Sequence, residues 1–300
     1  MAEYSARELL HAVNSTRIRE GNPRVCAITA RIVSDLFRTI EEFDVQTSEF
    51  MSAIKWLNAV GHSGQFGLVA PGLGFDRLLD ILEDERARRT GNLHGTPRAV
   101  EGPLYVPDAP MAFGEARLDD GTDEGDLLIM EGRVLDARGT PIPASIVDVW
   151  HASPEGFYSH FHPKPAPYNY RRRIQTDEGG RYRFRSLMPS GYAVPPGSPT
   201  AVLLDFLGRH GRRPAHIHFM ISAPGHPTLT TQINIPGDPY LDDDFAFATR
   251  DPLIVTLERV EDHPSIVAAG LDQPFTRIGF DFVLSPATEG ELAPAPIEKW

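Results

Sequence analysis

The sequence has little cysteine, no long apolar run and no excess of positive charge. Cys26 is the single cysteine in 300 residues, so no internal disulfide can form, and we expect a reducing, cytoplasmic environment. No apolar run approaches the roughly 18 residues that a helix needs to cross a bilayer, so we expect no membrane insertion. The formal net charge of -12 argues against nucleic acid as a partner, because phosphate binding needs a basic surface.

The first 95 residues carry the pattern of helices. Apolar side chains recur at helical spacing between Val25 and Ile40, between Phe50 and Val60, and between Leu73 and Leu82. Glycine and proline then become frequent between Gly91 and Pro110, which indicates a linker between two architectures. We therefore predict a helical region over 1–95.

Beyond the linker, the pattern changes to that of strands. Short β-branched or aromatic runs separated by turn residues predict strands over 128–135, 145–150, 181–185, 216–221, 230–235, 253–257 and 277–284. Such spacing is typical of an all-β sandwich, so the predicted fold is α+β, with the sandwich over 96–300. The run from Arg171 to Arg173 falls outside these strands, and we interpret it as solvated or salt-bridged.

The most informative motif is His216-Ile217-His218 on one of the predicted strands. Side chains alternate along a strand, so the two imidazoles start about 7 Å apart on one face and can converge on a metal ion. Taken alone, such a pair is more often structural than metal-binding. A second pair, His160 and His162, runs into prolines and is expected on a surface loop.

Two histidines supply half a coordination shell, and two tyrosines are candidates for the rest. Tyr158 and Tyr192 each stand among turn-forming residues beside a predicted strand. A phenolate is a hard anionic donor that favours iron(III), whereas zinc prefers thiolate, imidazole and carboxylate ligands. From the residues alone, each tyrosine is more typical of an ordinary half-buried side chain whose hydroxyl finds a backbone partner than of a metal ligand. A zinc hydrolase and a non-catalytic binding module therefore stay open as alternatives.

Six segments give the chain a resemblance to the intradiol ring-cleavage dioxygenases, running from about Gly21 to about Pro252. They are GTPRAVEGPLYV (95–106), VDVWHASPEGFYS (147–159), RYRFRSLMPSGYAVPP (181–196), LLDFLGRHGRRPAHIHF (203–219), APGHPTLTTQIN (223–234) and DDFAFATRD (243–251). The resemblance implies a non-haem Fe(III) centre and cleavage of catechol between its hydroxyls by O2, giving cis,cis-muconate. It places the metal ligands at Tyr158, Tyr192, His216 and His218.

The same resemblance assigns further roles. Tyr192 acts as ligand and then as base, Arg213 stabilises negative charge on the substrate, and Gln232 helps to organise the pocket. The positions that wall the catechol ring are Leu68, Pro71, Val100, Pro103, Leu104, Phe245 and Ala246. Relatives that act on hydroxyquinol tend to carry an acidic residue at the position of Pro71, so catechol is favoured here. Chlorocatechol and hydroxyquinol remain alternative substrates.

The resemblance also bears on partners. In the family, the helical region lies at a homodimer interface, so we expect a twofold-symmetric dimer through residues 1–95. Some relatives hold a phospholipid along that interface, and a lipid is a possible further ligand.

Overall fold

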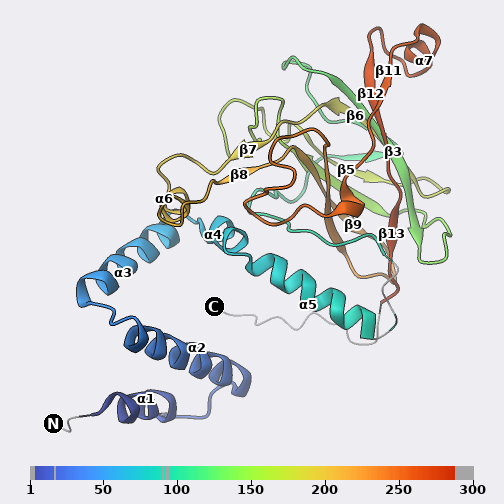
Figure 1. Ribbon diagram of the computed structural model, residues 1–300. Coiled ribbons are helices and arrows are strands. Elements are labelled where there is room, and N and C mark those ends of the chain that lie inside the picture. Colours follow the sequence, from blue (N-terminus) through green and yellow to red (C-terminus); the bar gives the residue numbers. More distant parts are fainter. Residues whose placement is uncertain (1–3, 17, 90, 92–94, 288–300) are drawn as a thin grey trace. The chain divides into compact units, whose positions relative to one another are not determined.

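The structure falls into two compact units. It is a computed structural model that describes residues 4–16, 18–89, 91 and 95–287, and the units are Met1–Ser63 and Gly64–Trp300 (Figure 1). None of the helices in the described part of the chain combines the length and the apolarity that spanning a bilayer requires.

The first unit consists of three helices, Ala6–Ser15 (α1), Pro23–Glu42 (α2) and Thr47–His62 (α3). Local sequence explains where they begin. The side chain of Ser5 and that of Glu8 form a capping box at α1. Asn22 accepts hydrogen bonds from the first amides of α2, and Pro23 occupies the first helical position, where its missing N–H costs nothing.

The second unit contains both sheets and the remaining helices. Its helices are Phe66–Gly72 (α4), Phe75–Arg89 (α5), Pro199–Phe206 (α6) and His263–Ala268 (α7), with a 3-10 turn at Asp251–Leu253. A five-stranded sheet has the order β1-β5-β4-β9-β10. Its strands are Met111–Phe113 (β1), Arg171–Gln175 (β5), Ile146–His151 (β4), His216–Ser222 (β9) and Leu229–Asn234 (β10).

The second sheet has six strands, in the order β11-β12-β3-β6-β2 with β13 also paired to β3. They are Glu258–Val260 (β11), Phe275–Gly279 (β12), Leu127–Asp136 (β3), Arg181–Leu187 (β6), Glu115–Arg117 (β2) and Phe282–Leu284 (β13). A separate ribbon joins Tyr192–Ala193 (β7) to Arg212–Arg213 (β8). The helical region followed by two sheets confirms the predicted α+β class.

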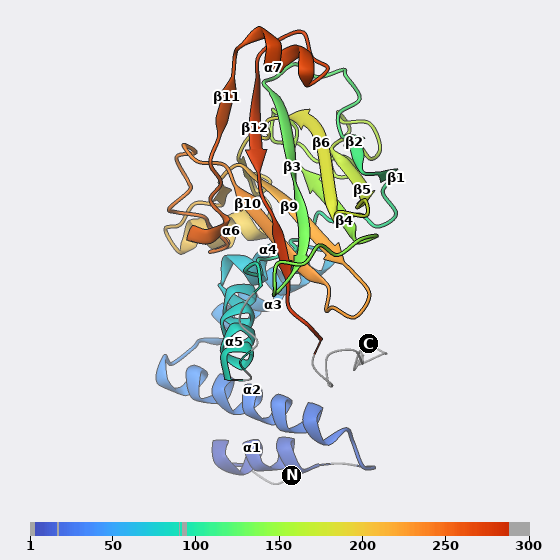
Figure 2. The same ribbon diagram turned by 90° about the vertical axis from the view of Figure 1, so that its right-hand side faces the viewer.

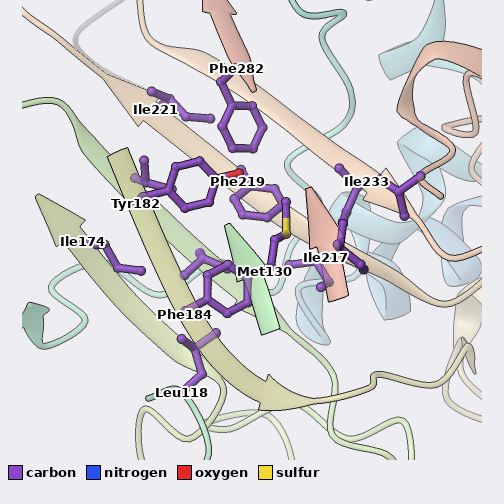
Figure 3. Packing of buried hydrophobic residues seen from close by; sticks show 14 of the residues in the cluster. Leu118, Met130, Ile174, Tyr182, Phe184, Ile217, Phe219, Ile221, Ile233 and Phe282 are labelled. Carbon is purple, nitrogen blue, oxygen red and sulfur yellow. The ribbon is translucent and has the colours of Figure 1, made fainter. Parts of the chain in front are cut away.

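The two sheets pack face to face over an apolar core, and Figure 2 shows β3, β6 and β12 of one sheet over β4 and β9 of the other. Ile217 and Phe219 of β9 reach into this core and meet Met130 and Phe184 from the opposite sheet (Figure 3). Because side chains alternate along a strand, burial of Ile217 turns its neighbours in the chain to the other face. The core therefore decides which way His216 and His218 point.

Three predictions about strands need correction. The segment 253–257 is not a strand, because Pro252 stands in a 3-10 turn and only Ile254 forms an isolated bridge. The segment 277–284 is two strands, β12 and β13, interrupted where Phe280 packs its carbonyl against Gly132. For the arginine run, which forms β5, the prediction is wrong at Arg171, which is 1% exposed, and confirmed at Arg173, which is half-buried and forms an ion pair with Asp108 at 3.5 Å.

Candidate metal centre

Four residues form a straight row across the five-stranded sheet. Arg171 of β5 pairs with Trp150 of β4, Trp150 pairs with His218 of β9, and His218 pairs with Gln232 of β10. Residues that pair directly across strands share one face of the sheet. The row therefore lies on the face opposite the apolar core, and all four side chains are buried.

The imidazoles of the His-x-His motif converge. The Nε2 atoms of His216 and His218 lie 3.0 Å apart. Nδ1 of His216 is 2.6 Å from the carbonyl oxygen of Pro214, a hydrogen bond that requires the proton on Nδ1 and leaves a lone pair on Nε2. His218 stacks on Trp150, with ring centroids 4.9 Å apart and planes 6° from parallel. Both rings are thus held in the orientation that a metal ligand needs.

Burial keeps both imidazoles neutral, which is the form that binds metal. Burial and the nearby Arg213 guanidinium lower the pKa of His216 to about 3. Burial, with the neighbouring His216 and Arg213, lowers the pKa of His218 well below its ordinary value. At neutral pH neither ring carries a positive charge, so each neutral imidazole has one lone pair that a metal can use.

The two candidate tyrosines lie beside these imidazoles. The ring of Tyr158 meets that of Tyr192 edge-on at 5.3 Å, and Tyr192 lies 5.5 Å from the ring of His216. Tyr158 is 3% exposed, and its hydroxyl makes no hydrogen bond of good geometry to any described residue. Such an orphaned buried oxygen is costly unless a ligand satisfies it. The four rings suit an iron(III) ion, which favours phenolate and imidazole donors.

A buried ion pair flanks the four rings. The guanidinium of Arg213 donates to both carboxylate oxygens of Asp244, at 3.2 and 3.1 Å, and to Oε1 of Gln232 at 2.8 Å. Its Nη1 also lies 3.1 Å from Nε2 of His216. Burial would lower the pKa of Arg213, but Asp244 and the tyrosines outweigh that effect and raise it. A permanent positive charge is therefore fixed beside the rings.

The sequence-predicted pocket residues fall mainly into two apolar clusters, of which one includes rings of this centre. Leu68, Val100, Phe245 and Ala246 belong to one apolar cluster, and Leu104 belongs to another that contains Tyr158 and Tyr192. The remaining two pocket residues are Pro71 and Pro103, and each lies next to a glycine. Pro103 packs against Gly67, and Pro71 is buried on α4 next to Gly72, which meets the ring of Phe245.

Alternative metal sites find no support in the described residues. No three side chains of His, Cys, Asp or Glu gather in that part of the chain, so His216 and His218 have no third ligand of these four types there. In the rival pair, Nε2 of His160 accepts from the amide of Tyr168, and the ring of His162 stacks on Phe157. These two imidazoles are already engaged locally.

Two residues of the centre were not singled out in the sequence. Trp150 reads as an ordinary apolar strand residue, and only the strand pairing places it against His218. Asp244 stands in a run of aspartates at 242–244, and its partner Arg213 is 31 residues away in sequence. The local sequence does not indicate which aspartate of such a run is buried.

Two family models cover most of the chain. The model described as dioxygenase matches residues 100–286, and the model described as catechol dioxygenase N terminus matches residues 22–91. The chain belongs to this family, the intradiol ring-cleavage dioxygenases, as its motifs predicted.

Within the family, the chain is similar to proteins named catechol 1,2-dioxygenase. It is 55% identical to catechol 1,2-dioxygenase 2 of Acinetobacter lwoffii over 87% of this chain and 95% of the relative. It is 51% identical to the Pseudomonas sp. enzyme over 92% of each. The crystal structure of the wild-type Acinetobacter radioresistens enzyme matches with a TM-score of 0.93 at 42% identity, covering 99% of this chain and 98% of that one.

Proposed function

We propose that this protein cleaves catechol between its two hydroxyl groups with dioxygen, giving cis,cis-muconate at a non-haem ferric centre. The observation that carries the proposal is the convergence of the His216 and His218 Nε2 atoms at 3.0 Å beside the orphaned hydroxyl of Tyr158. Both oxygen atoms of O2 enter the product, so the reaction needs no external reductant.

The ligands in this proposal are Tyr158, Tyr192, His216 and His218. The chemistry that ferric iron supplies when bound is Lewis acidity, which makes a chelated catechol dianion reactive toward dioxygen. Neutral imidazoles and anionic phenolates match the hard, trivalent ion. The apolar clusters that contain Val100, Leu104 and Phe245 would hold the ring of the substrate and exclude water.

Tyr192 is the ligand suited to move a proton. It is half-buried, whereas Tyr158 is fully buried, and it begins the two-residue strand β7 rather than a long strand. A phenolate at this position could accept a proton from a catechol hydroxyl. Tyr192 would then serve as ligand and base in turn.

Arg213 and Gln232 would stabilise the substrate. Arg213 faces Tyr192 directly across the β7–β8 ribbon and is fixed by Asp244, so its charge is already oriented before substrate arrives. Gln232 accepts from Arg213 and donates to Asn234 at 3.1 Å, which fixes the direction of its amide. The two side chains would offer a positive charge and a polar group to oxygen atoms that gain charge during cleavage.

The visible spectrum of the purified protein tests this proposal. We expect a burgundy protein with about one iron per chain, because phenolate-to-iron(III) charge transfer absorbs visible light. Catechol added under argon should shift the band to longer wavelength. A protein that stays colourless after reconstitution with iron would contradict the proposal.

Tyrosine variants locate the ligands. Tyr158→Phe and Tyr192→Phe should each lose or displace the band and lower the rate of catechol cleavage by at least 100-fold, in line with the loss of a catalytic group. Tyr182→Phe is the matched control, since Tyr182 is equally buried but donates to the carbonyl of Phe280 in the core. An unchanged band in both ligand variants would move the metal site elsewhere.

Catechol is the proposed substrate rather than chlorocatechol or hydroxyquinol. Pro71 offers no charge to a third hydroxyl group, and a Cβ added at Gly72 beside it would lie 3.3 Å from the ring of Phe245, so little space is free there. Comparing kcat/KM for the three compounds on one preparation decides the order. A higher value for either alternative would reassign the substrate and leave the ring-cleavage chemistry in place.

We also propose that residues 1–95 form the dimerisation region and residues 96–300 the catalytic region. Helix α2 carries an apolar stripe of Ile28, Ile32, Leu36 and Ile40, all exposed, and none of the residues in α1 or α2 is buried. An apolar stripe of this length is typical of an interface with a second copy. A phospholipid along the same stripe is part of this proposal.

Light scattering tests the dimer. The protein should elute with twice the chain mass of 33.2 kDa, and Ile32→Glu should yield a monomer, whereas Glu41→Gln on the same helix should not. Lipid extraction followed by mass spectrometry shows whether a phospholipid accompanies the dimer. A monomeric parent protein would contradict the interface.

A further inference from the structure

Arg171 is a buried guanidinium without a carboxylate partner. Its side chain is 1% exposed, yet none of the described carboxylates forms an ion pair with it. Nε donates to Oγ of Ser159 at 2.8 Å and Nη2 donates to the carbonyl oxygen of Ser159 at 3.1 Å. Nη1 is buried and has no hydrogen-bond partner among the described residues.

An isolated buried charge is expensive, so its retention needs a reason. Burial lowers the pKa of Arg171 to about 10, which still leaves the side chain positive at neutral pH. The two neutral acceptors of Ser159 cannot balance a full charge, and the carboxylate of Asp148 attracts the guanidinium only from beyond ion-pair distance. We therefore expect a negatively charged group to face this guanidinium in the active protein.

Two rings face Arg171, those of Phe161 and of the proposed ligand Tyr158, and only Tyr158 can carry a negative charge. The guanidinium carbon lies 5.7 Å from the centre of the Tyr158 ring and 5.9 Å from that of Phe161. Ser159 follows Tyr158 in the chain. The hydrogen bond from Arg171 to Ser159 therefore fixes the guanidinium against the segment that carries the proposed ligand. Pairing of Arg171 with Trp150, the ring that stacks on His218, places it in the same row as the metal centre.

We propose that Arg171 is a positioning residue for the metal centre, holding the Tyr158 phenolate by its positive charge. The inference rests on the proposed function, because only metal ligation makes Tyr158 an anion. The positive charge lowers the energy of the phenolate electrons and so raises the energy of their transfer to iron. The positive charge also stabilises Tyr158 in its anionic, metal-binding form, so the protein retains the metal more strongly.

Removing the charge should therefore change the colour and the retention of the metal. In Arg171→Gln the charge-transfer band should move to longer wavelength by roughly 10–20 nm, the order expected for one charge at this separation in a medium of effective dielectric constant about 20. Iron should be lost to a competing chelator roughly tenfold faster. Both readouts are independent of catalytic turnover.

Two further variants separate charge from structure. Arg171→Lys keeps the charge but loses the two-pronged contact with Ser159, so its band should stay within about 5 nm of the parent protein. Arg172→Gln is the matched control on the same strand, because Arg172 pairs with Val149 of the core face and donates to the carbonyls of Tyr168 and Arg171. Its band and its iron loss should equal those of the parent.

The outcomes distinguish the inference from the proposed function. A coloured parent with an unshifted band and unchanged iron loss in Arg171→Gln overturns the role of Arg171 and leaves the iron site standing. A band shift in Arg171→Lys as large as that in Arg171→Gln also overturns it. If the glutamine variant does not fold, the band of Arg171→Lys is compared with that of the parent, and a shift well beyond about 5 nm overturns the role of the charge. A colourless, iron-loaded parent overturns both proposals.

Discussion

Replacing Asp244 with asparagine should destabilise the protein strongly, because it leaves Arg213 charged and buried without its partner. The side chains of this pair are only 5% and 1% exposed. The Asp244 carboxylate also accepts from the backbone amides of Ala246 and Ala248, at 3.0 and 3.3 Å. Breaking a buried ion pair on one side typically costs about 3–5 kcal/mol. In a unit of this size, that corresponds to a fall in Tm of about 10 °C.

The pH dependence supplies an independent check. Burial alone would raise the pKa of Asp244, but the Arg213 guanidinium outweighs burial and lowers it. A lowered pKa in the folded state stabilises the protein above the unfolded pKa of about 4, and this stabilisation is lost as the pH falls through the folded value. An asparagine side chain at this position cannot titrate, so the variant should lack this part of the acid-induced loss of stability.

Thermal unfolding followed by circular dichroism measures these effects. Asp244→Asn should unfold about 10 °C below the parent protein at pH 7. The double variant Arg213→Gln with Asp244→Asn should recover at least half of that loss, because it buries no charge. A fall of less than about 3 °C, or a double variant that only adds the two single losses, would refute the reasoning.

Two further predictions concern single side chains. Burial raises the pKa of Asp148 to about 6 against the opposing hydrogen bond from Tyr105, so the parent should lose up to about 3 kcal/mol of stability as the pH rises from 4 to 6. Urea unfolding of Asp148→Asn should show a smaller fall in stability over the same pH range. An equal fall would show that this carboxyl is not the source of the pH dependence. A Cβ at Gly191 would lie 2.6 Å from the carbonyl oxygen of Arg213, so Gly191→Ala should displace the β7–β8 ribbon and speed the loss of iron, while Gly279→Ala, with open space around it, should not. Equal iron retention in both variants would contradict the close packing.

The parts of the site that follow strand periodicity could be predicted from sequence. Alternation along β9 is enough to place His216 and His218 together, since Ile217 belongs to the core. Tyr158 and Tyr192 could be found only through the family motifs, because one lies in a loop and the other in a two-residue strand. Local sequence carries no information on which loop returns to the same sheet face.

Buried charge explains why Arg171 and Asp244 were not predicted as buried. Three consecutive arginines indicate a solvated or salt-bridged run by composition, which describes Arg173 but not Arg171, because pairing of β5 with β4 places Arg171 on the buried row across the sheet. Asp244 was missed for the same reason. Buried charged residues are unfavourable in general and are retained where function requires them. Predictions based on the average behaviour of charged residues place them in solvent, so they are wrong at such positions.

If the chain binds iron as proposed, the row of four residues across the sheet makes iron binding a test of strand registration. Arg171, Trp150, His218 and Gln232 come from four strands and share one face only in the observed register. A slip of one residue between β4 and β9 would turn the facing side chains of one strand to the opposite side, placing an indole or an imidazole in the core. A misregistered chain could fold compactly and still fail to hold the metal. The colour of the protein would then report how faithfully each molecule has paired its strands.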